Sequence, residues 1–399
     1  MKTTYLLLCL LGIGSVSGAG QTKQPQKIGD FIESTSYNEH RRNATRSLQY
    51  TPDGDDFVCI NGKNRFTRAL YGSHTAFRLE TSDRPVFAAY TKENPKHICF
   101  KLQTSGGTVA LDSTEHCESR YTAGRRSYSL SDPAFGGGSL SITTWALPDK
   151  EGAIWQFNAR NFKEFHPVLL ASISEIRNSK LNRNGDMGAD PADSFEAPLQ
   201  PQQLQSFPVQ IDGTLYMLLE NQELRTLTTA EGENLFKKAE AARSETASRI
   251  RIETPDPYFN TLGGTLAMAA DGIWDGEVWL HGAIGWRMPL SGWRAAYTGD
   301  VLGWHDRART HFNAYAASQV TEVPNTFPHP AQDSALHLAR SVKKWGTPQY
   351  SNGYICRNPH RNNQMHHYDM NLCYIDELLW HFKWTGDLDY VRPMWPVIP

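Results

Sequence analysis

The sequence lacks the features that would connect it to nucleic acid, to a membrane or to a nucleotide cofactor. Its net charge is −2, and lysines and arginines are dispersed among acidic residues, so no basic run matches a phosphate backbone. No apolar run reaches the roughly 18 residues of a transmembrane helix. No P-loop, GxSxG or dinucleotide motif occurs in a suitable context. We therefore predict a globular protein without a nucleic-acid partner and without a stable membrane span.

Residues 1–20 predict an export signal. Lys2 supplies a positive start, residues 5–13 form a short apolar run, and residues 14–20 give a small-residue end. Residues 21–50 form a polar lead segment. We therefore expect an exported protein, either periplasmic or extracellular.

Cysteine is scarce, with six residues and no CxxC pair at the spacing of a zinc site. One disulfide among Cys59, Cys99 and Cys117 is as compatible with the sequence as buried free thiols. The adjacent His366 and His367 have no third ligand at helical spacing. We predict neither a metal site nor a cofactor.

Residues 51–230 predict an antiparallel β-sandwich. Short alternating runs such as AFRLET, HICFKLQ and SLSITTWAL are separated by turn clusters, among them DGDD and DPAFGGG. Residues 181–198 begin like a calcium loop, but the glycine and the distal glutamate miss the EF-hand offsets, so a polar loop is favoured.

The composition changes at residue 231. Residues 231–254 are charged and alanine-rich and predict an exposed linker helix, which Pro255 and Pro257 end. The part that follows is expected to be all-helical. The expected helices cover residues 259–274, 301–320, 331–346 and 370–386. Apolar spacing predicts two buried faces: Trp304, Ala308, His311, Phe312 and Tyr315 on the second helix, and Leu372, Ile375, Leu379 and Phe382 on the last.

Tryptophan is concentrated in the last third, which holds nine of the eleven residues, and five lie between Asp271 and Trp304. Sugars offer apolar C–H faces to indole rings and hydroxyl groups to acids, histidine and arginine. A segment that is dense in both predicts a carbohydrate site. A tryptophan-rich helical core is the alternative interpretation.

Three segments carry a family resemblance: SGWRAAYTGDVLGWHDRARTHF, YDMNLCYIDELLWHFKWTGD and LDYVRPMWPVI. They resemble exported glycoside hydrolases whose catalytic domain is a six-hairpin (α/α)6 toroid, such as the α-L-rhamnosidase and fucosidase families. They also resemble an uncharacterised family of exported gut-bacterial proteins in that superfamily. The resemblance implies an α+β multidomain protein with a β-sandwich, a linker helix and a toroid beginning near residue 255. It implies a carbohydrate substrate but no particular sugar or oligomeric state.

The length of the helical part departs from the family pattern. Twelve toroid helices with their loops need roughly 300 residues, whereas residues 255–399 provide 399 − 254 = 145. We therefore expect the sequence to be the N-terminal part of a longer protein. A small complete helical bundle is the alternative.

Glycoside cleavage requires two carboxyl groups. Glu277 is the preferred acid and Asp275 the second choice, because Trp274 and Trp279 flank both and would raise the pKa of one by desolvation. A helix-capping acid is the alternative. The resemblance implies an inverting mechanism with its base in the second half of the toroid, beyond Pro399.

The expected substrate-binding residues are Trp274, Trp279, His281, Trp286, Arg287, Trp293, Arg294, His366 and His367. The two Trp-Arg pairs would line subsites or form salt bridges with Asp300 or Asp306, and Asp300 is expected to cap a helix. Two other functions stay open. One is a non-catalytic glycan-binding protein. The other is a polysaccharide lyase that would use Tyr297, His281 and Arg294.

Overall fold

The computed structural model divides into two units, residues 1–48 and residues 49–399. The residues that it describes all belong to the second unit. They are 50–63, 68–72, 76–90, 96–162, 166–175, 205–208, 213–221, 223–283, 287–292, 296–321, 326–328, 332–333, 338–339, 348–350, 353–362 and 369–398. The expected export signal and calcium-like loop lie outside these residues.

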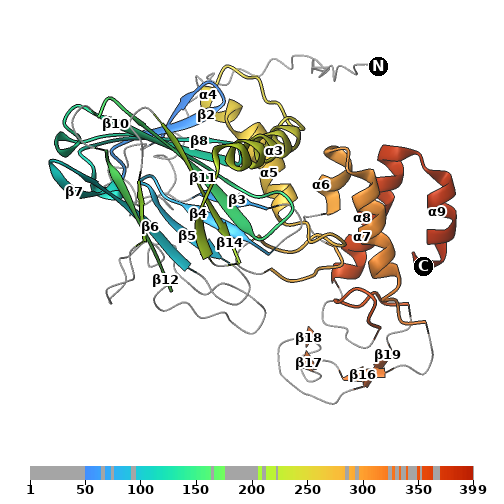
Figure 1. Cartoon of the computed structure of the whole chain (residues 1–399). Coiled ribbons are helices and arrows are strands. Elements are labelled where there is room, and N and C mark those ends of the chain that lie inside the picture. Colours follow the sequence, from blue (N-terminus) through green and yellow to red (C-terminus); the bar gives the residue numbers. More distant parts are fainter. Residues whose placement is uncertain are drawn as a thin grey trace, which may run out of the picture. The chain divides into compact units, whose positions relative to one another are not determined.

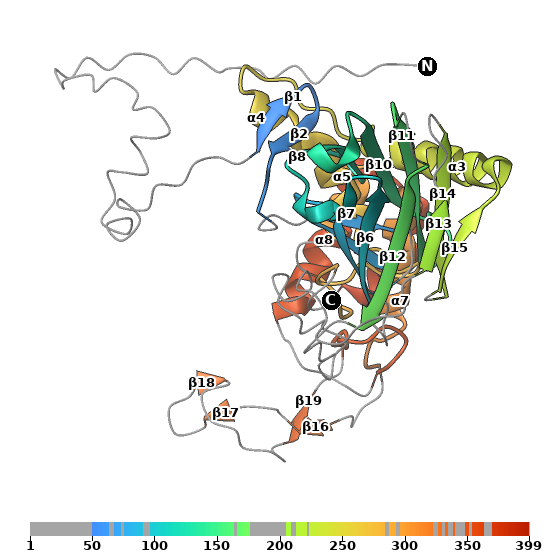
Figure 2. The same cartoon turned by 60° about the vertical axis from the view of Figure 1, so that its left-hand side comes forward.

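Two antiparallel sheets form the N-terminal part of this unit (Figures 1 and 2). The first has the order β1 (Thr51–Asp53), β2 (Asp56–Ile60), β8 (His116–Thr122), β9 (Arg125–Ser131), β10 (Ser139–Ala146), β11 (Gly152–Arg160), β14 (Thr214–Glu220) and β15 (Glu223–Leu227). The second has the order β13 (Gln205–Pro208), β12 (Val168–Glu175), β6 (Lys96–Thr104), β5 (Val86–Tyr90), β4 (Arg78–Thr81) and β3 (Arg68–Tyr71), and β7 (Gly107–Ala110) also pairs with β6.

Alternating side chains explain why these segments form strands that bury one face. In β8 and β9 every second residue is buried. Aromatic rings join the two sheets: the Phe87 ring lies 5.5 Å from that of Trp155, and the Phe100 ring 5.0 Å from that of Phe157. The core therefore lies between the sheets. Cys59, Cys99 and Cys117 are free thiols.

The expected linker helix is α3 (Thr229–Ala247), which begins with a reciprocal capping box between Thr228 and Glu231. One side of α3 packs on the eight-stranded sheet, where the Phe236 ring lies 3.9 Å from the Trp145 ring. The Trp145 indole N–H donates to Glu240 at 2.8 Å. Exposure is therefore limited to the other side of the helix.

The helical part contains α4 (Pro257–Asn260), α5 (Leu262–Gly272), α6 (Ala296–Val301), α7 (His305–Ala316), α8 (Asp369–Thr385) and α9 (Leu388–Met394), followed by a 3-10 turn at Trp395–Val397. Helices α6, α7 and α8 contact one another (Figure 1). Residues 302–304 and 386–387 make short connections, whereas residues 273–295 and 317–368 make long ones. The helix ends that the short connections join are called the short-loop end, and the helix ends that the long connections join are called the long-loop end.

Two features of the helical part differ from expectation. Residues 326–350 contain small antiparallel strand pairs, β16 (Thr326–Pro328) with β19 (Pro348–Tyr350) and β17 (Gln332–Asp333) with β18 (Leu338–Ala339), where a helix was expected over 331–346. Within the expected range, Gln332 pairs with Ala339 and Asp333 with Leu338, so these described residues make strand contacts with each other and not the contacts of a helix. On α8, Leu372 is 74% exposed, and Tyr374, Leu378 and His381 face the core instead.

The α7 prediction is confirmed, because all five residues of its stripe are buried. Two antiparallel sheets followed by helices also confirm the α+β class. None of the helices in the described part of the chain combines the length and the apolar character needed to cross a bilayer.

Candidate functional site

The acids predicted from the sequence lie on a tight turn after α5. Isolated bridges pair Trp274 with Trp279 and Leu280 with Pro289, so the chain folds back on itself within residues 273–280 and again between residue 280 and residue 289. The turn closes through the Asp275 amide, which donates to the Val278 carbonyl at 3.2 Å. Gly276 has a φ of 102°. Residues with a Cβ atom rarely adopt this backbone conformation, whereas glycine adopts it readily. The glycine between the two acids therefore sets the shape of the turn.

Asp275 acts mainly on its own backbone. Its Oδ1 accepts the Glu277 amide at 3.0 Å and the Val278 amide at 2.8 Å. Such a short-range pattern is the usual way in which aspartate stabilises a turn. The capping role that the sequence left open therefore applies to Asp275, although within the turn and not at a helix start.

Trp274 and Trp279 lie in the core beneath this turn. Both side chains are buried, and their ring centroids are 4.7 Å apart. Gly299 of α6 makes room for Trp279, because a Cβ at that glycine would lie 2.3 Å from the indole. The two rings thus support the turn from inside and do not form an exposed stacking surface. This arrangement differs from the expected sugar-binding floor.

His311 of α7 fixes the base of the turn. Its Nδ1 accepts the Trp279 amide N–H at 3.2 Å, and its ring lies 5.6 Å from the Trp279 ring. Burial lowers the pKa of His311 to about 3, so the imidazole is neutral at physiological pH and keeps its acceptor lone pair. The sequence placed His311 on a buried stripe but did not reveal this positioning role.

Glu277 projects from the turn toward solvent. Its side chain is 49% exposed, and its Oε1 lies 2.6 Å from Nε2 of His360. His360 belongs to the other long connection, where its amide donates to the Ala314 carbonyl at 3.0 Å at the end of α7. Its φ of 59° is unusual for a non-glycine residue. Because 83 residues separate the two partners, no local sequence signal could have identified His360.

Each of the two long connections also contains an arginine that contacts another residue, Arg287 in the first and Arg357 in the second. Nη1 of Arg287 donates to the Gly272 carbonyl at 3.4 Å, and burial lowers the pKa of this arginine while nearby Asp275 raises it. Arg357, three residues before His360, contacts the sulfur of Met288. The long-loop end therefore brings acids, arginines and an imidazole to one region.

The remaining predicted residues divide into two groups. His281 is half-buried, and its amide donates to the Met288 carbonyl at 2.9 Å, so it belongs to the same folded-back segment. The other group lies outside the described residues: Trp286, Trp293, Arg294, His366 and His367.

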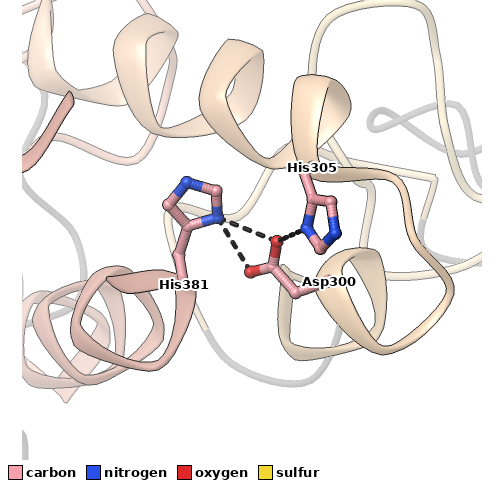
Figure 3. Close-up of side chains that lie close together, drawn as sticks. All are labelled: Asp300, His305 and His381. Carbon is pink, nitrogen blue, oxygen red and sulfur yellow. Dashed lines mark hydrogen bonds and ion pairs between the residues drawn. The ribbon is translucent and has the colours of Figure 1, made fainter. Parts of the chain in front are cut away.

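A second polar cluster occupies the short-loop end (Figure 3). Asp300 lies in α6 near its end and accepts from two histidines, His305 at 2.7 Å and His381 at 2.8 Å. It does not cap the start of a helix as expected, because it lies inside α6 and the N-cap position of α7 is Trp304. Each of these three residues offers one nitrogen or oxygen atom that could bind a metal ion. The three atoms lie within 4.8 Å of one another, and this is the group of that kind within the described residues. The sequence did not indicate this cluster, since its members come from three helices.

Comparison with known proteins gives one family match. Residues 95–250 match the family described as "Domain of unknown function (DUF4450)". No curated protein matches the chain. The matched residues include β6 to β15 and α3, and the turn that carries Glu277 lies outside them.

Proposed function

We propose that this chain is an exported glycoside hydrolase in which Glu277 serves as the acid at the long-loop end. The observation that carries the proposal is the exposed Glu277 carboxylate held 2.6 Å from the His360 imidazole. An acid that protonates a leaving group must be open to substrate and fixed in direction. The hydrogen bond to His360 fixes the carboxylate, and the rigid indole base below the turn fixes its backbone.

The helical arrangement supports assignment to the first part of an (α/α) toroid. Short and long connections alternate between consecutive helices, and the acids lie at the long-loop end. Longer loops at one end of a helical array give room for a binding site that the scaffold positions. The sequence resemblance of the segments around α6, α7 and α8 to toroid glycosidases points to the same chemistry.

A non-catalytic glycan-binding role is the second candidate. Hydrolysis needs a second carboxyl group across the scissile bond. Asp275 sits on the same turn as Glu277, and its Oδ1 is engaged by two backbone amides. The turn therefore supplies one carboxyl group to a ligand, which is sufficient for binding a sugar hydroxyl but not for two-carboxyl catalysis.

A polysaccharide lyase is less well supported. Such an enzyme needs a tyrosine or histidine base, for which the sequence offers Tyr297 or His281. Burial and the hydrogen bond from its hydroxyl to Asp376, at 2.5 Å, raise the pKa of Tyr297 above its usual value. A tyrosine that is harder to deprotonate is a poorer base at neutral pH.

The test uses the purified protein with a panel of aryl glycosides and oligosaccharides, and it measures both released sugar and binding. Glu277→Gln should lower turnover by about 10²-fold or more, since a general acid contributes that much. Glu233→Gln is the matched control, because Glu233 is similarly exposed and pairs with Lys237 at 3.9 Å. Turnover that is unchanged in Glu277→Gln refutes the assignment.

The same panel separates the alternatives. Binding that depends on Glu277 without any hydrolysis establishes the glycan-binding role. Products that absorb as unsaturated uronides establish a lyase.

A further inference from the structure

The short-loop end contains a buried carboxylate among histidines. The Asp300 side chain is 4% exposed, and that of His381 is fully buried. The His381 ring packs edge-on against Tyr390 at 5.4 Å and at a tilt of 58° against Phe312 at 5.7 Å. These contacts fix both side chains within the contacting helices α6, α7 and α8.

Within the described part of the chain, no arginine forms an ion pair with Asp300. Its contacts in the described structure are the Nδ1 atoms of His305 and His381, at 2.7–2.9 Å. The arginines of α7 pair with other acids, Arg307 with Asp271 and Arg309 with Asp306 and Asp387. A buried carboxylate requires a cationic partner or a metal ion, because removal from water strongly disfavours an isolated charge.

The donor set has the chemistry of a transition-metal site. Two imidazole nitrogens and one carboxylate oxygen suit zinc and similar divalent ions, and catalytic or open zinc sites commonly use three protein ligands and water. The three donor atoms all lie within 4.8 Å of one another. His305 is 42% exposed, so an ion can enter from its side and a water molecule can complete the coordination.

We infer that Asp300, His305 and His381 bind a divalent transition-metal ion, with Zn²⁺ as the best fit, and that the ion joins α6, α7 and α8. Binding needs a small opening of the cluster. Metal–ligand distances of about 2.1 Å in tetrahedral geometry separate the donors by about 3.4 Å, which is about 0.6–0.7 Å more than the present contacts of 2.7 and 2.8 Å. For Nδ1 to bind the ion, a neutral imidazole must carry its proton on Nε2 in place of Nδ1, and a protonated imidazole must release its Nδ1 proton to solvent.

The expected affinity is moderate. A metal-bound histidine normally donates its second N–H to a partner, and loss of that contact weakens binding by about 10–100-fold. Nε2 of His381 is buried without a hydrogen-bond partner in the described structure. We therefore expect zinc to bind about 10–100-fold more weakly than at a site whose histidines all have such a partner.

The test is titration of the chelator-treated protein with ZnCl₂ by isothermal calorimetry, with visible Co²⁺ absorption as a second signal. We expect one ion per chain and a higher melting temperature with zinc. Asp300→Asn and His305→Ala should each weaken binding at least about 10-fold. Asp306→Asn is the matched control, because this exposed acid lies one residue beyond His305 and pairs with Arg309. It should leave the affinity within about twofold.

His305→Ala decides the result if Asp300→Asn does not fold, since the His305 ring is partly exposed. The inference is overturned if 100 µM Zn²⁺ does not bind, or if both cluster variants bind as well as the unmodified protein. It is also overturned if His360→Ala, at the opposite end of the helices, abolishes binding.

Discussion

Acidification should weaken the support of the Glu277 turn through His311. This imidazole is buried, and its Nδ1 accepts the Trp279 amide N–H at 3.2 Å. A protonated imidazole has no lone pair at Nδ1. Protonation would therefore break this hydrogen bond and place a charge in the core. Burial lowers the pKa of His311 to about 3, from an ordinary value of 6.5, for this reason.

The size and direction of the effect follow from proton linkage. The unfolded chain binds the proton near pH 6.5, and the folded chain binds it near pH 3. The contribution of His311 to stability is therefore complete above pH 6.5 and is lost progressively as the pH falls toward 3. Each pH unit in this window lowers the free energy of unfolding by about 1.4 kcal/mol, which gives about 2.7 kcal/mol at pH 4.5.

Urea unfolding at pH 7.0, 5.5 and 4.5, followed by circular dichroism, measures this loss. His311→Asn is the informative variant, because its Oδ1 can accept the same amide but does not titrate. Between pH 7.0 and 4.5 the unmodified protein should lose about 2.7 kcal/mol more than this variant. His360→Asn is the control at an exposed histidine and should behave like the unmodified protein. The predicted effect of His311 is refuted if the free energy of unfolding falls by the same amount, within about 0.5 kcal/mol, in His311→Asn and in the unmodified protein.

Three further predictions concern stability. Trp279→Ala should lower the free energy of unfolding by about 3–5 kcal/mol. Trp384→Ala is the control, because Trp384 is 52% exposed, and it should change this free energy by about 0.5 kcal/mol or less. Denaturant titration of the two variants measures the difference. Gly276→Ala should cost at least about 1–2 kcal/mol because of its positive φ, and an unchanged melting temperature would contradict the described turn. Thr228→Ala should cost about 1 kcal/mol by removing the capping box of α3, with faster amide exchange in its first turn as the measurement.

The sequence predicted elements well where apolar spacing alone determines burial. The α7 stripe is an example, since Ala308, Phe312 and Tyr315 recur on one face and all are buried. On α8 the same reasoning was wrong for Leu372. Polar contacts determine how α8 is turned: His381 faces inward to Asp300, and Asp376 accepts the Tyr297 hydroxyl. A hydrophobicity pattern contains no information about such partners.

The candidate site shows the same limit. The turn with Asp275 and Glu277 could be located from its composition, because glycine beside two acids indicates a tight exposed loop. The contact between Glu277 and His360 could not be found, since it forms when two long connections meet at one end of the helices. The Asp300 cluster likewise depends on how three helices pack, and each of its residues looks ordinary in its local sequence.

The tryptophans require a different view of how this site would hold a sugar. Their density between Asp271 and Trp304 suggested stacking, but the indoles of Trp274 and Trp279 are buried under the turn. Among the described residues, a sugar above Glu277 would therefore meet the polar groups of the turn and His360 before the indoles of Trp274 and Trp279. These polar groups would bind sugar hydroxyls through hydrogen bonds, which are strongly directional and weak in water. Recognition at this end should consequently depend on the position of the hydroxyl groups more than on the apolar area of the sugar.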